Sequence, residues 1–407
     1  MGLLSKKAKA DADGDVFHDV QEAWLHDAAS DEGGYACKDK ETLERQRSAI
    51  FEFVKEVGKK IILGGGNLMN MSMPVKMFEP RSYLQKLTDV WVHPRLLDRA
   101  AETRDPVERM RLVVAWFLSG MQYAFDQWAK PFNPLLGETF QGELDDGSKI
   151  FIEQVSHHPP ISVFEYVGKN GRYKFSGSSQ PDVKYKTSQN ALQTFAHGAR
   201  VVTFHDGTKI DIKYPTYYLK GLVYVPEPRA ELIGDATFTD ARNGLECKVQ
   251  FGPIKTAPDP LLRRTDTVHG AIVSTAPTSD PEDVVAGRHR FIKAFHGGKG
   301  INLHGMKVMS VLTGNWLSHV DWDDTRYWTL QEEEGDEFVK DPIRRYHWKS
   351  VKSPLPSDSQ FREDLARLRD GDKKDSQKWK EIMENRQRAD KKHRVKYWES
   401  KGLKYKH

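Results

Sequence analysis

The middle of the chain, from about residue 139 to residue 251, alternates apolar and polar positions with a period of two. Segments such as SKIFIEQV, ISVFEYV, RYKFSG, ARVVTFH, TKIDIKY and YYLKGLVYV show this alternation, and turn sequences such as DDG, KNG and HDG separate them. A period of two places successive side chains on opposite faces of a strand, and Asp-Gly or Asn-Gly favours tight hairpins. Further strands are expected at 245–251, 266–274, 302–312 and 327–330. The pattern predicts a long antiparallel meander, which must curl into a large, near-closed β-barrel with a cavity.

Apolar positions with helical spacing lie on both sides of this region. Helices are expected at 41–63, 83–100, 105–128 and 376–398. The third helix has a clear start signal: Asp105 at the N-cap, Pro106 at the first helical position and Glu108 at the capping-box position. The fold class is therefore mainly β with flanking helices.

These patterns divide the chain into five parts. They are an acidic, disordered head at 1–40, an amphipathic region at 41–80, a helical layer at 81–138, the β-barrel at 139–340 and a C-terminal helical, basic subdomain at 341–407.

The net charge of +4 conceals a strong asymmetry between the two ends. Residues 1–40 hold nine acids and five lysines, whereas residues 372–407 hold thirteen Lys and Arg and six acids. A basic segment suits either nucleic acid or an anionic membrane surface, and no nucleic-acid-binding motif supports the first. We therefore expect peripheral contact with membranes and no nucleic-acid partner.

Two further features restrict the setting of the protein. The longest apolar run, 112–118, is too short to span a bilayer. The two cysteines, Cys37 and Cys247, form neither a disulfide framework nor a metal-ligand spacing, which favours a reducing compartment. A cytoplasmic protein without metal or other cofactor is expected.

The most informative short stretch is EQVSHHPP, residues 153–160, at the end of a predicted strand. Alternation places His157 on one face of the strand and His158 on the other, and Pro159 and Pro160 end the ladder. Imidazoles held at a strand end can donate hydrogen bonds to an anion. A plain turn with one buried and one exposed histidine also fits the stretch.

A metal-dependent hydrolase that uses Glu153, His157 and His158 is another possibility for the same stretch. Adjacent side chains on opposite faces suit a metal site poorly, and no third ligand stands at a characteristic spacing. We therefore expect no catalytic residues.

The predicted C-terminal helix carries Lys380, Glu384 and Arg388 at i, i+4 and i+8. They form one stripe about 12 Å long, and Glu384 can pair with both cations. Such spacing is also common on solvated helices.

Three motifs in order, KPFNP/LLGE at 130–138, EQVSHHPP at 153–160 and K-x3-E-x3-R at 380–388, resemble the signature of the oxysterol-binding protein-related family over about residues 63–393. The family consists of soluble lipid carriers, so the resemblance implies a monomeric barrel that encloses a lipid tunnel. It implies that the phosphatidylinositol 4-phosphate headgroup is bound by Lys130, Asn133, His157, His158, Lys380 and Arg388, with Glu384 organising the cations. The second lipid stays open between a sterol and another membrane lipid.

The same resemblance implies a lid in front of the barrel. The expected helix at 41–63 and the Met-rich stretch after it occupy that place, and unbranched methionines adapt to different acyl chains. An ordinary surface helix packed on the domain fits the same pattern. The lid residues are Leu68, Met69, Met71 and Met73.

The acidic head contains DADGDVFHDVQEA, which resembles the FFAT motif that docks proteins on the VAP receptor of the endoplasmic reticulum. Phe17 would be the apolar anchor, and Asp19 and Glu22 would fix the register. The segment departs from the motif at His18, where a second aromatic is usual, and at Val16, where an acid is usual. A solvated acidic tail is the alternative.

The expected function is extraction and exchange of phosphatidylinositol 4-phosphate and a second lipid between organelle membranes or at their contact sites. A lipid sensor or scaffold without net transfer is the runner-up, ahead of the hydrolase.

Overall fold

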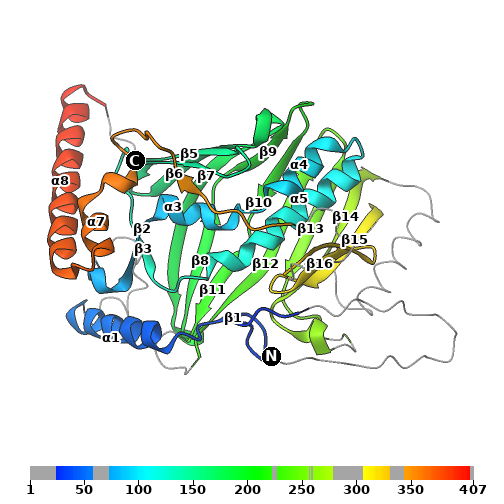
Figure 1. Cartoon of the computed structure of the whole chain (residues 1–407), viewed down its shortest axis with the longest axis horizontal. Helices are drawn as coiled ribbons and strands as arrows, with labels where there is room; N and C mark the ends of the chain where they lie inside the picture. Colours follow the sequence, from blue (N-terminus) through cyan, green and yellow to red (C-terminus); the bar gives the residue numbers. More distant parts are fainter. Residues whose placement is uncertain are drawn as a thin grey trace.

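The structure is a computed structural model that describes residues 24–57, 73–221, 227–255, 257, 260–277, 306–330 and 343–403. The described residues form one curled antiparallel sheet of sixteen strands, with helices against its concave side and at one end (Figure 1). A parallel pair of short strands, β2 (Phe78–Ser82) and β3 (Lys130–Phe132), stands apart from that sheet. The prediction of a mainly β fold with flanking helices is confirmed.

The strands of the large sheet follow the chain closely. They are β1 (Tyr35–Ala36), β4 (Thr139–Glu143), β5 (Lys149–His157), β6 (Pro160–Val167), β7 (Tyr173–Lys186), β8 (Ala191–His197), β9 (Arg200–Phe204), β10 (Lys209–Lys213), β11 (Thr216–Lys220), β12 (Arg229–Asp240), β13 (Leu245–Phe251), β14 (Thr267–Pro277), β15 (Met306–Asn315), β16 (His319–Trp322), β17 (Thr325–Thr329) and β18 (Lys349–Ser350).

The two longest strands, β7 and β12, each pair with two partners on the same side. The first part of β7 pairs with β9 and the rest with β8, while β12 pairs with β11 and then with β10. The strands β8 and β9 therefore form one interrupted strand, and so do β10 and β11, where Pro215 lacks the N–H that a continuous ladder needs. From β4 to β17 the sheet is an up-and-down meander.

The remaining elements of the described chain are α-helices and short 3₁₀ helices (η). They are α1 (Lys40–Val57), η2 (Val75–Met77), α3 (Tyr83–Leu87), η3 (Thr88–Val90), α4 (Pro94–Glu102), α5 (Pro106–Gly120), η4 (Met121–Ala124), η5 (Lys169–Gly171), η6 (Thr187–Gln189), η7 (Pro260–Arg263), η8 (Ser359–Phe361), α7 (Glu363–Arg369) and α8 (Lys373–Ser400).

The helix α5 supplies much of the core against the concave face of the sheet. Its Trp116 packs edge-to-face on Phe175 of β7 with ring centroids 5.0 Å apart, and its Phe117 packs on Phe238 of β12 at 5.3 Å. These rings are buried in one cluster shared by the helices and the strands. Part of the barrel interior is therefore filled by helix rather than open.

The predicted helices are found, with corrections at their ends. Asp105 caps α5 by accepting from Val107 N–H at 2.9 Å, but the capping box is wrong, because Asp105 N–H donates to Thr103 Oγ1 and Glu108 pairs with Tyr327 and Arg111. The expected helix at 105–128 ends as an α-helix at Gly120, and η4 continues it to Ala124.

The expected helix at 83–100 is instead three pieces, α3, η3 and α4. The break precedes Pro94, because a residue before proline is driven out of the helical region, and His93 adopts φ −117° and ψ 64°. Strands β8, β12 and β16 were not among the predicted segments.

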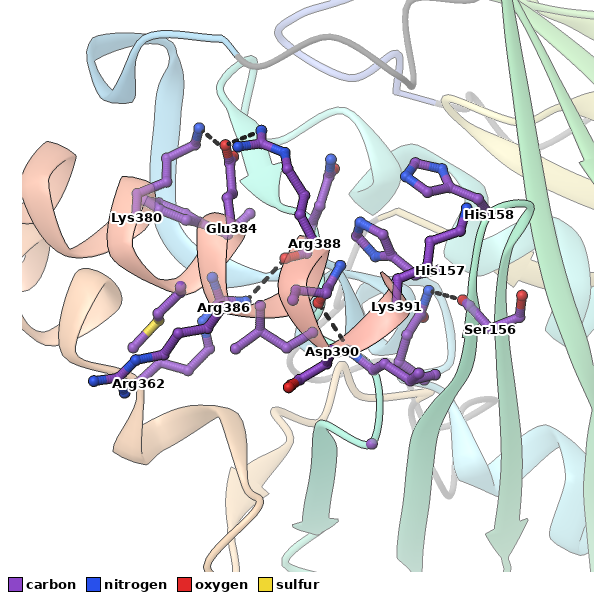
Figure 2. A pocket seen from close by; sticks show the side chains of 18 of the residues that line it. Ser156, His157, His158, Arg362, Lys380, Glu384, Arg386, Arg388, Asp390 and Lys391 are labelled. Carbon is purple, nitrogen blue, oxygen red and sulfur yellow. Dashed lines mark hydrogen bonds and ion pairs between the residues drawn. The ribbon is translucent and has the colours of Figure 1, made fainter. Parts of the chain in front are cut away.

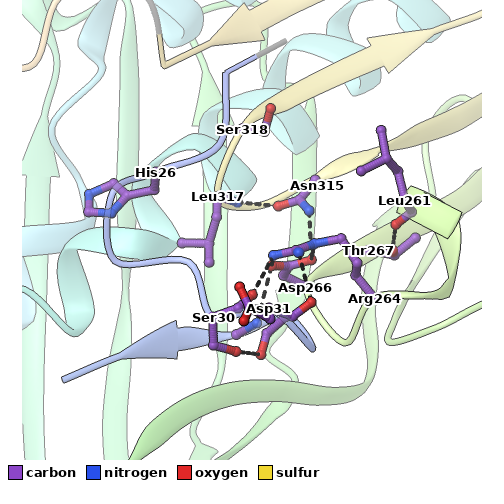
Figure 3. Close-up of polar contacts among 12 residues, drawn as sticks. His26, Ser30, Asp31, Leu261, Arg264, Asp266, Thr267, Asn315, Leu317 and Ser318 are labelled. Atoms are coloured by element: carbon purple, nitrogen blue, oxygen red, sulfur yellow. Dashed lines mark hydrogen bonds and ion pairs between the residues drawn. The ribbon is translucent and has the colours of Figure 1, made fainter. Parts of the chain in front are cut away.

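Residues 24–39, predicted as part of a disordered head, are instead held against the barrel; we call them the N-terminal strap. Strand β1 of the strap pairs with β12, and the backbone N–H of Gly34 donates to the fully buried carboxylate of Asp266 at 3.1 Å. Arg264 and Asn315 bind the same carboxylate at 2.7 Å (Figure 3). Gly34 has φ +88°, and a Cβ there would lie 2.7 Å from Ala230 O. This close approach requires glycine.

Candidate functional site

Three segments far apart in the sequence meet around one hollow of about 830 Å³ between α8 and the β5–β6 hairpin (Figure 2). The loop after β3 contributes Asn133, the hairpin contributes His157 and His158, and α8 contributes its Lys380–Arg388 stripe. Of the predicted headgroup residues, Lys130 lines an adjoining hollow rather than this one.

The two histidines stand at the tip of the hairpin, where β5 ends at His157 and β6 begins at Pro160. The prediction that they face opposite ways is wrong, because β5 ends at His157 and His158 lies in the turn that follows, where the alternation of a strand no longer applies. Both rings are half-buried, 4.4 Å apart between centroids, and both line the hollow. Burial, followed by the neighbouring ring of His158, lowers the pKa of His157 to about 4. His157 is therefore neutral near pH 7, and the N–H of its ring donates to the backbone carbonyl of Pro134.

Lys130 begins β3, and its ammonium group lies beside Asn133, another of the predicted headgroup residues. Its Nζ donates to Asn133 Oδ1 at 2.6 Å and lies 4.8 Å from the centroid of the Phe78 ring. Burial, followed by the positive charge of Lys380, lowers the pKa of Lys130 to about 7. Lys380 Nζ lies 5.6 Å from the centroid of the same Phe78 ring, and an anion near both ammonium groups would stabilise their charges.

The stripe on α8 has the predicted arrangement. Glu384 Oε1 accepts from Lys380 Nζ at 2.6 Å, and Glu384 Oε2 pairs with an Arg388 nitrogen at 3.1 Å. Figure 2 shows the carboxylate between the two cations on one side of the helix. Lys380 is buried whereas Arg388 is exposed, so the stripe runs from the inner end of the hollow towards solvent.

Sequence reasoning missed the residues that hold the loop 133–138 in place. The buried guanidinium of Arg362 donates to Glu138 at 2.7 Å, to Asp364 at 2.6 Å and to the backbone carbonyl of Asn133 at 2.9 Å. Glu138 also accepts from Leu135 N–H at 2.8 Å. The glutamate of LLGE was a usable signal, because a buried carboxylate needs a cationic partner.

Other missed residues belong to α8. Gln387 accepts from Leu136 N–H at 3.2 Å and so ties the helix to the same loop. Arg386, Lys391 and Arg394 line the hollow beyond the predicted stripe.

The adjoining hollow, of about 170 Å³, leads towards the barrel interior. It shares Asn133, Gln154, His157 and His158 with the outer one, and Tyr83 and Tyr217 line its inner part. This volume is below the roughly 300–1,000 Å³ of typical small-molecule pockets. The aromatic core described above therefore leaves a narrow inner space in this conformation.

The predicted lid and docking residues are mostly outside the described residues: Leu68, Met69, Met71, Phe17, Asp19 and Glu22. Met73 is described, lines the large hollow and packs beside the cluster of Val75, Met77, Phe78, Phe132 and Leu365. Helix α1 reaches that cluster through Gln46, whose Nε2 donates to Met77 O at 3.2 Å. The last of the expected lid residues thus lies at the edge of the hollow.

Two other kinds of site are absent from the described part of the chain. It contains no group of three or more His, Cys, Asp or Glu side chains placed to hold a metal ion. None of its helices combines the length and the apolar character needed to cross a bilayer.

Residues 56–291 match the family model described as Oxysterol-binding protein. The chain is 33% identical to Oxysterol-binding protein 9 of Dictyostelium discoideum over 366 residues, which cover 88% of this chain and 79% of that protein. It is 32% identical to human Oxysterol-binding protein-related protein 5 over 224 residues, 54% of this chain. The chain spans only 25% of that human protein's length.

Two solved structures are similar in fold. Osh3 ORD in complex with PI(4)P from Saccharomyces cerevisiae aligns with a TM-score of 0.62 and 21% identity, over 85% of this chain and 84% of that one. Osh1 ORD in complex with ergosterol aligns with a TM-score of 0.62 and 22% identity, over 86% and 80%. The near-closed barrel expected from the meander is thus a fold seen before.

Proposed function

The chain belongs to the oxysterol-binding protein family, whose members bind and carry lipids rather than catalyse reactions, and from this premise we propose that it extracts phosphatidylinositol 4-phosphate and exchanges it for a second lipid between membranes. The headgroup would occupy the hollow between α8 and the β5–β6 hairpin. The acyl chains would enter the adjoining hollow of about 170 Å³, which must widen to accept them.

The observation that carries the proposal is the convergence of cations and neutral donors from three separate segments on one hollow. Lys380 and Arg388 supply charge, held in place by Glu384, and Asn133, His157 and His158 supply directional donors. A phosphate monoester carries up to two negative charges and three acceptor oxygens, so it matches this mixture of charge and donors. The complex of Osh3 ORD with PI(4)P supports the same ligand class.

The second lipid is a sterol or another membrane lipid that competes for the inner hollow. The complex of Osh1 ORD with ergosterol supports a sterol. Burial of apolar surface, worth about 0.8 kcal/mol per CH₂ group, would drive entry of either ligand. The protein would work as a peripheral visitor of organelle membranes, with the segment 41–73 closing over bound lipid and the FFAT-like head docking on VAP.

The double variant His157→Ala/His158→Ala tests the headgroup site. Its extraction of phosphatidylinositol 4-phosphate from vesicles should fall by orders of magnitude, because each lost charge-assisted contact is worth roughly 1.5–3 kcal/mol. The fold should survive, since both rings are half-buried at a hairpin tip.

The matched control is His205→Ala. His205 is an exposed histidine in the β9–β10 turn and does not line the hollow. This variant should extract like the unchanged protein. Normal extraction by a folded double variant would refute the headgroup site. If the unchanged protein binds phosphatidylinositol 4-phosphate but does not transfer it between vesicles, a lipid sensor is favoured instead.

A further inference from the structure

The C-terminal end of α8 carries a cluster of exposed large apolar side chains. Tyr397, Trp398 and Leu403 are 60%, 40% and 51% exposed. The rings of Tyr397 and Trp398 contact each other edge-to-face at 6.4 Å between centroids, and Lys401 Nζ lies 5.7 Å from the centre of the Tyr397 ring. We call these three apolar residues the C-terminal knob.

The knob is a formed structure rather than a frayed end. Gly402 follows the helix with φ +69°, its N–H donates to Glu399 O at 2.9 Å, and Leu403 N–H donates to Trp398 O at 3.0 Å. This is the Schellman arrangement, which frequently brings the residue after the glycine beside the residue whose carbonyl it caps. The chain thus returns Leu403 towards Trp398.

The knob lies in line with the headgroup hollow. Eighteen residues separate Lys380 from Trp398, which is five full turns, so both project from the same side of α8 about 27 Å apart. Lys391 lies close to the same line and borders the hollow, as does Arg394. The row that begins inside the hollow therefore continues past it and ends in an aromatic side chain.

No other part of the described chain covers this end. From residue 392 to residue 403 every side chain is exposed except that of Val395, whereas the buried residues of α8, Ser376 and Lys380, are in its first turns. In Figure 1 the end of α8 stands apart from the other ribbons. Packing among the described residues therefore gives no reason for two adjacent exposed aromatics.

The charges around the knob indicate what it contacts. Between 391 and 401 one acid, Glu399, stands among Lys391, Lys392, Arg394, Lys396 and Lys401. Tyr and Trp beside Lys and Arg are typical of the water–bilayer interface, where the rings sit at headgroup level and the cations contact anionic lipids.

We propose that the C-terminal knob docks on an anionic bilayer surface, with Tyr397, Trp398 and Leu403 entering the interfacial layer and the flanking cations contacting lipid phosphates. Docking there brings the headgroup hollow to the membrane from which a headgroup is taken. The proposal deepens the proposed function and rests on it for this consequence, but bilayer docking itself needs no ligand in the hollow.

The test uses the full chain and vesicles that contain no phosphoinositide. Co-sedimentation should show binding to vesicles of phosphatidylcholine with phosphatidylserine and little binding to phosphatidylcholine alone. The variant Tyr397→Ser/Trp398→Ser should bind the anionic vesicles at least about tenfold more weakly than the unchanged protein. The matched control is Phe361→Ser, because Phe361 is 58% exposed at a different place, and it should bind normally.

A second measurement separates this proposal from the headgroup site. Binding of soluble glycerophosphoinositol 4-phosphate should be unchanged in Tyr397→Ser/Trp398→Ser and lost in His157→Ala/His158→Ala, whereas the histidine variant should still bind anionic vesicles. Normal vesicle binding by the knob variant overturns the proposal. So does a concentration-dependent dimer that the same variant abolishes, because the knob would then contact a second copy of the chain.

Discussion

The ammonium group of Lys130 is the charge that its surroundings alter most within the proposed headgroup site. With a pKa lowered to about 7 by burial and by Lys380, it is only partly protonated near neutral pH. A bound phosphate would raise this pKa, because an opposite charge favours the protonated form. Proton uptake by Lys130 is therefore coupled to headgroup binding.

The sign of the pH dependence follows. Affinity for glycerophosphoinositol 4-phosphate should be lost as pH rises above about 7, by up to about tenfold per unit, because Lys130 must then be protonated on binding. Below pH of about 6 the phosphate itself gains a proton and affinity should fall again. Calorimetric titrations across this range should give a maximum between the two values.

The variant Lys130→Met is the control for this prediction. It should bind more weakly, keep the acidic decline and lose most of the alkaline decline. An unchanged alkaline decline in this variant would assign the effect to another group.

At the residue scale, sequence motifs predicted the candidate headgroup residues and missed the residues that hold them in place. The stripe of Lys380, Glu384 and Arg388 is visible in helical spacing alone. Arg362 is not, because its role depends on a fold that brings it to Glu138 and Asp364. The prediction that His157 and His158 face opposite ways also failed, since the strand ends between them and a turn residue does not follow strand alternation.

At the scale of single elements, α5 shows how tertiary contact decides where a helix ends. A Cβ at Gly120 would lie 1.9 Å from the backbone oxygen of Val90, so η3 and α5 approach each other at a position that only glycine permits. Capping residues predicted the start of α5, and apolar periodicity predicted its buried face. Its end is set by η3, which is far from it in sequence.

Gly120→Ala should therefore destabilise the protein although alanine favours helices. We expect a loss of about 1–3 kcal/mol in the free energy of unfolding, measured by urea denaturation, because backbone has to move to admit the methyl group. Ser119→Ala, one residue away, is the comparison; it removes the hydrogen bonds to Trp116 O and to His93 Nδ1 without adding atoms. A Gly120→Ala protein as stable as the original would show that η3 can shift freely.

At the scale of the whole molecule, the meander could be predicted from the sequence because its strands pair with strands close to them in sequence. The strap was not, since it is held by Arg264, Asp266 and Asn315, which lie more than two hundred positions away. Composition alone described residues 24–39 as part of a polar head. Their anchoring begins at His26, whose N–H donates to Leu317 O, so the FFAT-like segment at 11–23 ends in sequence shortly before a fixed point.

This arrangement makes the head testable by itself. A labelled peptide of residues 8–23 should bind the VAP receptor domain with micromolar affinity, around 8 kcal/mol, and more weakly as salt is added, because its acids steer it to a basic groove. The Phe17→Ala peptide should lose most of this binding. Equal binding by both peptides, or none by either, would leave the head as a solvated tail.

The hydrogen bond between Leu136 and Gln387 joins positions 251 residues apart, and it has a consequence for the order of events during synthesis. A ribosome adds roughly 5–20 residues per second, so tens of seconds separate the two halves of the headgroup hollow. The strands from β4 to β17 emerge and can pair within that interval, before α8 exists. A nascent chain can therefore complete its barrel while it still lacks Lys380 and Arg388, and the proposed headgroup capture would begin only after α8 has been made.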